Sequence, residues 1–169
     1  MFQEYTSKDT SINSSKLPAI YNKINWNLFK NGKVLDIGAG KFIDHIISFL
    51  KKYSIKYFPY DRYNIGPEIN RKSLAVKPDI IICSNVLNVI KENEIVAEIH
   101  NLVRSYNKPY FITVYNANHT GIGKPTKNGY QRNQRLKDYL YIDEVMYKNT
   151  ITMNKYTKYL KKGWQKWSS

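Results

Sequence analysis

Residues 34–42 read Val34-Leu35-Asp36-Ile37-Gly38-Ala39-Gly40-Lys41-Phe42, an apolar run that breaks into two glycines. Glycine allows positive φ angles and lets a ligand approach the backbone closely. The apolar residues of the following stretch, from Phe42 to Leu50, recur at helical spacing. The stretch therefore predicts a strand, a glycine turn and a helix. Two glycines also occur in plain strand-to-helix connections, so the turn alone does not establish a ligand site.

The glycine turn favours a ligand that carries no phosphate. A dinucleotide-binding turn has a third glycine, and this chain has Phe42 or Ile43 at that place. The carboxylate of Asp36 repels a phosphate, whereas it attracts an ammonium or sulfonium group. We therefore expect Asp36 to take part in binding a cationic ligand.

Further strands are expected along the chain. Residues 57–61 read as a short strand that ends in a carboxylate, Asp61, 25 residues after Asp36. The continuous apolar run of residues 80–83 is typical of a strand that is covered on both faces. Residues 109–115 are also strand-like. The interval from Asp61 to Asp79 is short for another full helix and strand, so we expect an abbreviated unit there.

Residues 92–106 carry apolar side chains at helical spacing. Strand and helix thus alternate from residue 33 to 116, which predicts an α/β fold with a doubly wound, mostly parallel sheet. Such sheets bind ligands at the carboxyl ends of their strands. Gly38, Asp61, Asn85 and Asn116 are all expected at that edge.

The 169 residues are sufficient for one domain. We divide it into an N-terminal lead-in (1–31), a ligand-binding core (32–118) and a basic C-terminal segment (119–169). The single cysteine, Cys83, excludes an internal disulfide and is expected in the core. Three scattered histidines give no metal-site spacing. No apolar run is long enough to span a membrane and no signal segment is visible, so we expect a cytoplasmic protein.

The chain carries a net charge of +14. Residues 121–169 contain eleven Lys and Arg against three acidic residues, so they carry +8 of the total. Clustered basic side chains favour a polyanionic partner such as nucleic acid. The chain is also rich in Asn, Ile and Tyr, a composition expected from an AT-rich genome. Such a genome raises the lysine content for reasons unrelated to binding.

Residues 121–135 are too polar and glycine-rich for a core. They follow the expected edge of the site, and a substrate-gripping lid and a flexible solvated loop are both open interpretations. The candidate substrate-binding residues are Lys124, Lys127, Tyr130, Gln131, Arg132 and Arg135. Residues 132–147 are expected to form a helix, and residues 159–167 a docking tail, with base stacking on a nucleic acid as the open alternative.

Residues 34–40 resemble motif I of the class I S-adenosylmethionine-dependent methyltransferases, and residues 79–90 resemble motif IV. The phrases at 60–64, 84–90 and 126–133 are similar to those of small phage-type members, which implies an enzyme of the host-cell cytoplasm. The resemblance implies a Rossmann-like methyltransferase fold with S-adenosyl-L-methionine as cofactor. The residues it implies for cofactor binding are Asp36, Gly38, Ala39, Gly40, Asp61, Arg62, Ser84 and Asn85.

The methyl acceptor is less well indicated. Amino methyltransferases usually carry an Asn/Asp-Pro-Pro-aromatic motif, where this chain has Ser84-Asn85-Val86-Leu87, and no Pro-Cys motif for cytosine C5 chemistry is present. The candidate catalytic residues are Asn85, Tyr115, Asn116 and His119, of which only His119 ordinarily titrates near neutral pH. A non-catalytic binding module and an enzyme that degrades S-adenosylmethionine remain alternatives.

Overall fold

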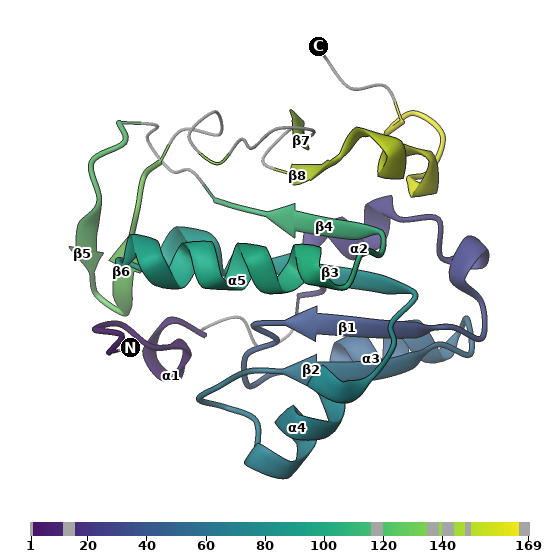
Figure 1. The fold of residues 1–169 in the computed structure, drawn as a ribbon, viewed down its shortest axis with the longest axis horizontal. Helices are drawn as coiled ribbons and strands as arrows, with labels where there is room; N and C mark the ends of the chain where they lie inside the picture. The colour runs from purple at the N-terminus through teal and green to yellow at the C-terminus, as the bar shows by residue number, and fades with distance from the viewer. Residues whose placement is uncertain are drawn as a thin grey trace.

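Strand β1 (Lys33–Ile37), formed by the residues before the glycine turn, lies inside the main sheet (Figure 1). The computed structural model describes residues 2–11, 16–115, 120–134, 139, 144–147 and 150–165, with backbone only for 144–147 and Asn154. Within them the main sheet has six strands in the order β2-β1-β3-β4-β8-β7. Its other strands are β2 (Lys56–Tyr60), β3 (Ile80–Ser84), β4 (Tyr110–Thr113), β7 (Glu144–Tyr147) and β8 (Thr150–Met153).

The first four strands are parallel, as the sequence predicts. Strand β8 runs antiparallel to β4, and β7 runs antiparallel to β8. The side chains of Ile80, Ile81, Ile82 and Cys83 in β3 are fully buried. This burial explains the continuous apolar run, because a parallel strand covered on both faces leaves no position for a polar side chain.

Helices cover both faces of the sheet. Figure 1 shows α4 (Pro67–Ala75) and α5 (Asn93–Ser105) on the near face, and α2 (Ala19–Lys23) and α3 (Asp44–Lys51) on the far face. The hydroxyl of Tyr106 donates to the carbonyl of Leu74, which joins α5 to α4. The predicted α/β fold, with a mostly parallel sheet flanked by helices, is confirmed.

Three shorter helical segments are 3₁₀ helices: η1 (Trp26–Phe29), η2 (Leu87–Val89) and η4 (Asn154–Tyr159). A four-residue helix, α1 (Ser7–Thr10), lies near the N-terminus. Strands β5 (Lys124–Thr126) and β6 (Gly129–Gln131) form a separate antiparallel hairpin. We call residues 124–131 the β5–β6 hairpin.

The expected abbreviated unit between Asp61 and Asp79 is confirmed, because these residues form helix α4 and no strand before β3, which begins at Ile80. Another local prediction was wrong. The helix expected over residues 132–147 is absent at both described ends of this range: residues 132–134 are irregular and Glu144–Tyr147 form a strand. Pairing with β8 favours the extended form there, and the positions between these two stretches, Tyr139 apart, lie outside the described residues.

The C-terminal segment docks on the lead-in. Leu160 forms an antiparallel bridge with Ile24, and the amide of Lys161 donates to the carbonyl of Lys23 at 2.9 Å. Both Ile24 and Leu160 are buried. The expected docking tail is therefore present over the described residues up to Gln165.

The order of the strands creates a reversal point. From β1 the chain passes through α3 to the edge strand β2, and it returns through α4 to β3 on the other side of β1. The carboxyl ends of β1 and β3 consequently lie side by side with their loops diverging. In open α/β sheets this is the usual place of a ligand crevice.

Candidate functional site

A cavity of about 500 Å³ lies at the carboxyl ends of β1, β2 and β3. Its wall consists of the loops that follow these strands, the buried side of α5 and residues from the N-terminal end of the chain. This volume lies within the range of about 300–1,000 Å³ typical of small-molecule sites. The cavity is the candidate functional site.

The glycine turn forms one wall of the cavity. Gly38 and Gly40 have φ angles of 77° and 71°, which disfavour other residues. A Cβ atom at Gly38 would collide with Val86 in the loop after β3, and one at Gly40 would collide with Ser11. Both glycines are therefore needed for the close packing of this wall.

The amides of the turn are engaged within the protein. Those of Gly38 and Ala39 donate to the carbonyl of Tyr60 at 2.8 and 3.1 Å. The amide of Gly40 donates to Asp61 Oδ2 at 3.0 Å, and that of Lys41 donates to Ser11 Oγ at 3.2 Å. Phosphate-binding turns instead direct their N–H groups at the ligand. The amides of this turn are therefore not available to a phosphate group.

Asp61 lies in the cavity wall directly after β2 and is only 3% exposed. Its Oδ1 accepts hydrogen bonds from Ser7 Oγ at 2.6 Å and from the amides of Tyr63 and Asn64 at 2.9 and 3.0 Å. Asn70 of α4 fixes the backbone of Asp61 through both its N–H and its carbonyl oxygen. A buried carboxylate held in this way is a strong and well-oriented acceptor.

Asp36 does not line the cavity. Its Oδ2 accepts hydrogen bonds from the hydroxyls of Tyr21 at 2.8 Å and Tyr57 at 2.7 Å. Burial raises the pKa of the Asp36 carboxyl from 3.8 to about 6, against the lowering effect of the two tyrosines. The structure thus places Asp36 in the core beside the site, and does not bring it to the ligand as the sequence suggested.

The loop after β3 supplies a second polar wall. Ser84 and Asn85 line the cavity, as does Arg62 after β2. Ser84 Oγ lies 2.8 Å from Thr113 Oγ1, and the amide of Asn85 donates to the carbonyl of Thr113. Asn85 has a φ angle of 57°, which turns the chain sharply at the end of the strand. The predicted cofactor residues thus surround the cavity, with the exception of Asp36.

Two of the four candidate catalytic residues are found at the cavity. Asn85 is exposed within it, and Tyr115, with 60% of its surface exposed, lines the mouth. Asn116 and His119 lie outside the described residues. The carbonyl oxygen of Tyr115 accepts a hydrogen bond from Gln131 Nε2 at 2.7 Å, so the hairpin is joined to the mouth.

The candidate substrate residues have different surroundings. Lys124 and Lys127 are exposed, whereas Tyr130 stacks on Tyr5 with ring centroids 5.6 Å apart. Gln131 is the one described member of this group that lines the cavity. Arg135 lies outside the described residues.

Arg132 has a structural role in the fold. Its Nη1 donates to the carbonyls of Ile90 and Lys91, Nη2 donates to Asn93 Oδ1, and Nε donates to Gln134 Oε1. These contacts fix the end of the hairpin to the start of α5. The guanidinium is therefore committed within the protein and is not presented to a phosphate.

Sequence reasoning missed much of the cavity wall. Gln3, Ser7 and Thr10 line it, and so do the α5 side chains Ile95, Glu98, Ile99 and Leu102. The apolar α5 positions were visible as a helical face, but the pattern does not say which of them reach a cavity. No sequence signal connects Ser7 with Asp61, because the contact depends on the path of the N-terminal residues.

Cys83 is buried in β3, and burial raises the pKa of its thiol. It therefore behaves as a core residue, as expected. Among the residues that the structure describes, no group of three His, Cys, Asp or Glu side chains is arranged to hold a metal ion.

A search of the described helices found none with the length and apolar character needed to cross a membrane.

Comparison of the chain with models of protein families, with curated proteins and with solved structures finds no match.

Proposed function

We propose that the protein is an S-adenosylmethionine-dependent methyltransferase. The observation that carries this proposal is the pairing of a glycine turn without free amides and a carboxylate at the end of the neighbouring strand. A nucleoside ligand with an uncharged sugar suits this pair, because Asp61 can accept from sugar hydroxyls while the turn offers nothing to a phosphate. The resemblance of residues 34–40 and 79–90 to methyltransferase motifs points the same way.

The remaining wall also suits the cofactor. Ile95, Ile99 and Leu102 of α5 provide apolar surface for a purine ring. Ser84 and Asn85 provide polar groups on the other side. The residues present therefore fit the cofactor, provided that Ser7 leaves the Asp61 carboxylate for the sugar. When bound, the cofactor supplies a methyl group on a positively charged sulfur, which is already an activated electrophile.

The chain itself has to position the acceptor and exclude water. Asn85 and Tyr115 lie where they can orient an acceptor at the mouth of the cavity, and Gln131 fixes Tyr115 through its backbone. The net charge of +14 favours a nucleic acid or another phosphate-bearing acceptor. Exposed Arg62 at the cavity and Lys124 and Lys127 on the hairpin are the basic residues available for it.

A second candidate is a binding module without turnover. It is favoured by one observation: the oxygens of Asp61 already accept hydrogen bonds from Ser7, Gly40, Tyr63 and Asn64. If the Ser7 contact were permanent, the carboxylate would serve only to hold the fold. The two candidates differ in whether a nucleoside cofactor binds at all.

Isothermal titration with S-adenosylmethionine and S-adenosylhomocysteine tests the proposal. We expect micromolar binding that Asp61→Asn weakens strongly, because an amide is a poorer acceptor for two sugar hydroxyls. Asp44→Asn is the matched control, since Asp44 is an exposed carboxylate at the start of α3 near the same turn. Circular dichroism of each variant shows whether the fold is retained.

Transfer of a radiolabelled methyl group is then measured with separate pools of DNA, RNA, protein and metabolites. Label in one pool identifies the acceptor. Loss of cofactor without a labelled acceptor would instead indicate an enzyme that degrades S-adenosylmethionine. The absence of cofactor binding, together with salt-sensitive affinity for nucleic acid, would establish the binding module.

A further inference from the structure

Residues 2–11, which we call the N-terminal arm, contribute side chains to the wall of the cavity. Figure 1 shows the arm beside the β5–β6 hairpin, at the end of the sheet to which β1 points. Gln3, Ser7, Thr10 and Ser11 of the arm all line the cavity. The arm is therefore a wall of the candidate site.

Two arm hydroxyls bind polar groups of the site. Ser7 Oγ donates to Asp61 Oδ1 at 2.6 Å and accepts from Asn64 Nδ2 at 2.8 Å. Ser11 Oγ accepts from the amide of Lys41 next to the glycine turn. Ser7 thus presents a hydroxyl to the carboxylate that the proposed cofactor would engage with its sugar. The Ser7 hydroxyl and a sugar hydroxyl of the ligand would therefore compete for the Asp61 carboxylate.

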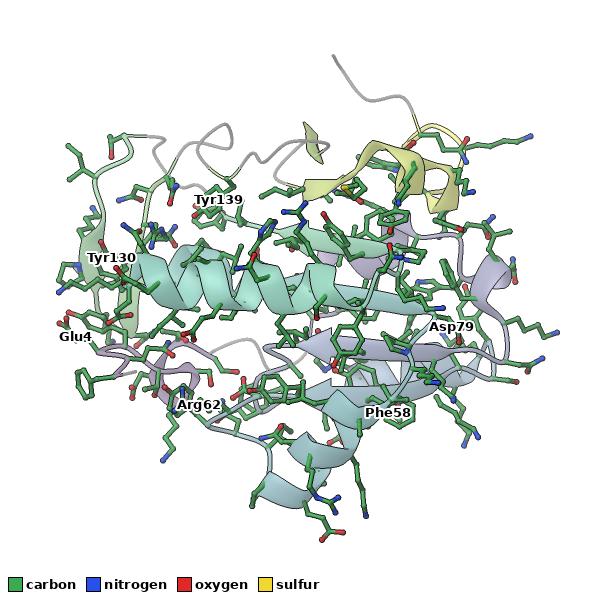
Figure 2. The ribbon with its side chains drawn as sticks, viewed as in Figure 1. Glu4, Phe58, Arg62, Asp79, Tyr130 and Tyr139 are labelled. Atoms are coloured by element: carbon green, nitrogen blue, oxygen red, sulfur yellow. The ribbon has the colours of Figure 1, made fainter. Side chains whose placement is uncertain are left out.

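The arm also contacts the hairpin and the loop before α5. Tyr5 stacks on Tyr130 with an interplanar angle of 21°, and Thr10 packs so closely on Gly129 that no Cβ atom would fit there. Glu4 forms an ion pair with Lys91. Figure 2 shows Glu4 and Tyr130 at the same end of the molecule. The arm therefore connects the site to the region expected to receive the acceptor.

None of the arm residues is buried. They are held by hydrogen bonds, an exposed ion pair and a ring contact, and they contribute no side chain to the core. Segments with few buried apolar contacts open at a small free-energy cost. The arm can thus lift while the sheet stays folded.

We propose that the N-terminal arm is a lid whose Ser7 hydroxyl is exchanged for a sugar hydroxyl of the ligand at Asp61. The proposal rests on the proposed function, because it takes a nucleoside with a free 2′,3′-diol as the ligand. Lifting of Ser7 also withdraws Tyr5 from Tyr130. Ligand entry at the site consequently uncovers an aromatic face on the hairpin for the acceptor.

Hydrogen exchange of the arm, followed by mass spectrometry of the full chain, tests this directly. The probes are S-adenosylmethionine, adenosine and 2′,3′-dideoxyadenosine. Saturating S-adenosylmethionine or adenosine is expected to accelerate exchange in residues 7–11 several-fold, and dideoxyadenosine is expected to leave it unchanged. Slower exchange on binding would overturn the proposal, because it would show that the arm closes onto the ligand.

Substitution of Ser7 gives a second, independent readout. Ser7→Ala removes the competing hydroxyl and is expected to tighten adenosine binding about tenfold, the effect of one hydrogen bond to a charged group. Thr6→Ala is the matched control, because the Thr6 hydroxyl contacts Asp9 and not Asp61. Weaker binding by Ser7→Ala would identify Ser7 as a direct ligand contact. It would overturn the proposal that a sugar hydroxyl replaces the Ser7 hydroxyl at Asp61.

The outcomes separate this inference from the proposed function. Suppose that adenosine binds and accelerates hydrogen exchange in the arm, while S-adenosylmethionine does not bind. This result would refute the proposed methyltransferase and support the proposed lid. Binding and turnover of S-adenosylmethionine without a change in the hydrogen exchange of the arm would support the proposed enzyme and refute the proposed lid. If neither nucleoside bound, both proposals would be wrong.

Discussion

Replacing Asp36 by asparagine is expected to remove a pH dependence of stability that the buried carboxylate imposes. Asp36 is 3% exposed and accepts hydrogen bonds from two tyrosine hydroxyls, but it forms no ion pair with any residue that the structure describes. Burial disfavours the charged form, so the folded protein retains a proton that the unfolded chain releases at lower pH. Stability therefore falls as the pH rises through this window.

The magnitude follows from the displacement of the pKa of Asp36 from 3.8 to about 6. At about 1.4 kcal/mol for each pKa unit, the full displacement corresponds to about 3 kcal/mol of stability, of which about 2.4 kcal/mol is lost between pH 4 and pH 7. Asp36→Asn keeps an oxygen for the two tyrosines and carries no charge. The variant should therefore gain about 2.4 kcal/mol relative to the wild type between these pH values.

Urea denaturation of both proteins at pH 4, 5, 6 and 7 measures the difference. Other carboxylates titrate equally in the two proteins. The informative quantity is therefore how the difference in free energy of unfolding between variant and wild type changes with pH. Tyr57→Phe is a useful companion, because loss of its hydroxyl removes a contact that lowers the pKa of Asp36 and should move the transition above pH 6. A constant difference, or a wild type that gains on the variant as the pH rises, would refute the reasoning.

Three further outcomes are expected. Arg132→Met should cost about 1–3 kcal/mol in urea denaturation, because it leaves the carbonyls of Ile90 and Lys91 without their donor, while nucleic-acid affinity in a filter assay stays unchanged. Gly38→Ala should lower the free energy of unfolding by at least about 1–2 kcal/mol, because its φ angle of 77° alone strains any other residue. Adding Val86→Ala to this variant should recover only the part of the loss that comes from the collision between the new Cβ atom and Val86. Cys83 should react with a thiol reagent no faster than the protein unfolds, so rapid labelling of the folded chain would contradict its burial.

Much of the parallel half of the fold was predictable. The continuous apolar run of residues 80–83 indicates a strand that is buried on both faces, and the apolar spacing of residues 92–106 indicates a helix that is buried on one face. The apolar spacing of residues 132–147 was compatible with a helix, and pairing of Glu144–Tyr147 with β8 overrode it. Strand formation depends on a partner that local spacing does not reveal.

The candidate site divides in the same way. Asp61 and the glycine turn were recognisable because each stands at the end of an apolar strand, and parallel strands bring such ends together. Asp36 was misplaced because alternation along β1 says that its side chain leaves one face of the sheet, but not whether that face holds a cavity or two tyrosines. Arg132 was read as a phosphate contact because its carbonyl partners are more than thirty residues away along the chain.

The sequence by itself determined the alternation of strand and helix, the turn at Gly38 and Gly40, and the carboxylate that ends β2. These features arise from residue-level preferences and from periodicity, which act over a few positions. Only the tertiary structure decided that Ser7 reaches Asp61 and that the N-terminal arm lines the cavity. Such contacts join residues that are 54 positions apart, and they exist only once the packing of the core has fixed the path of the chain.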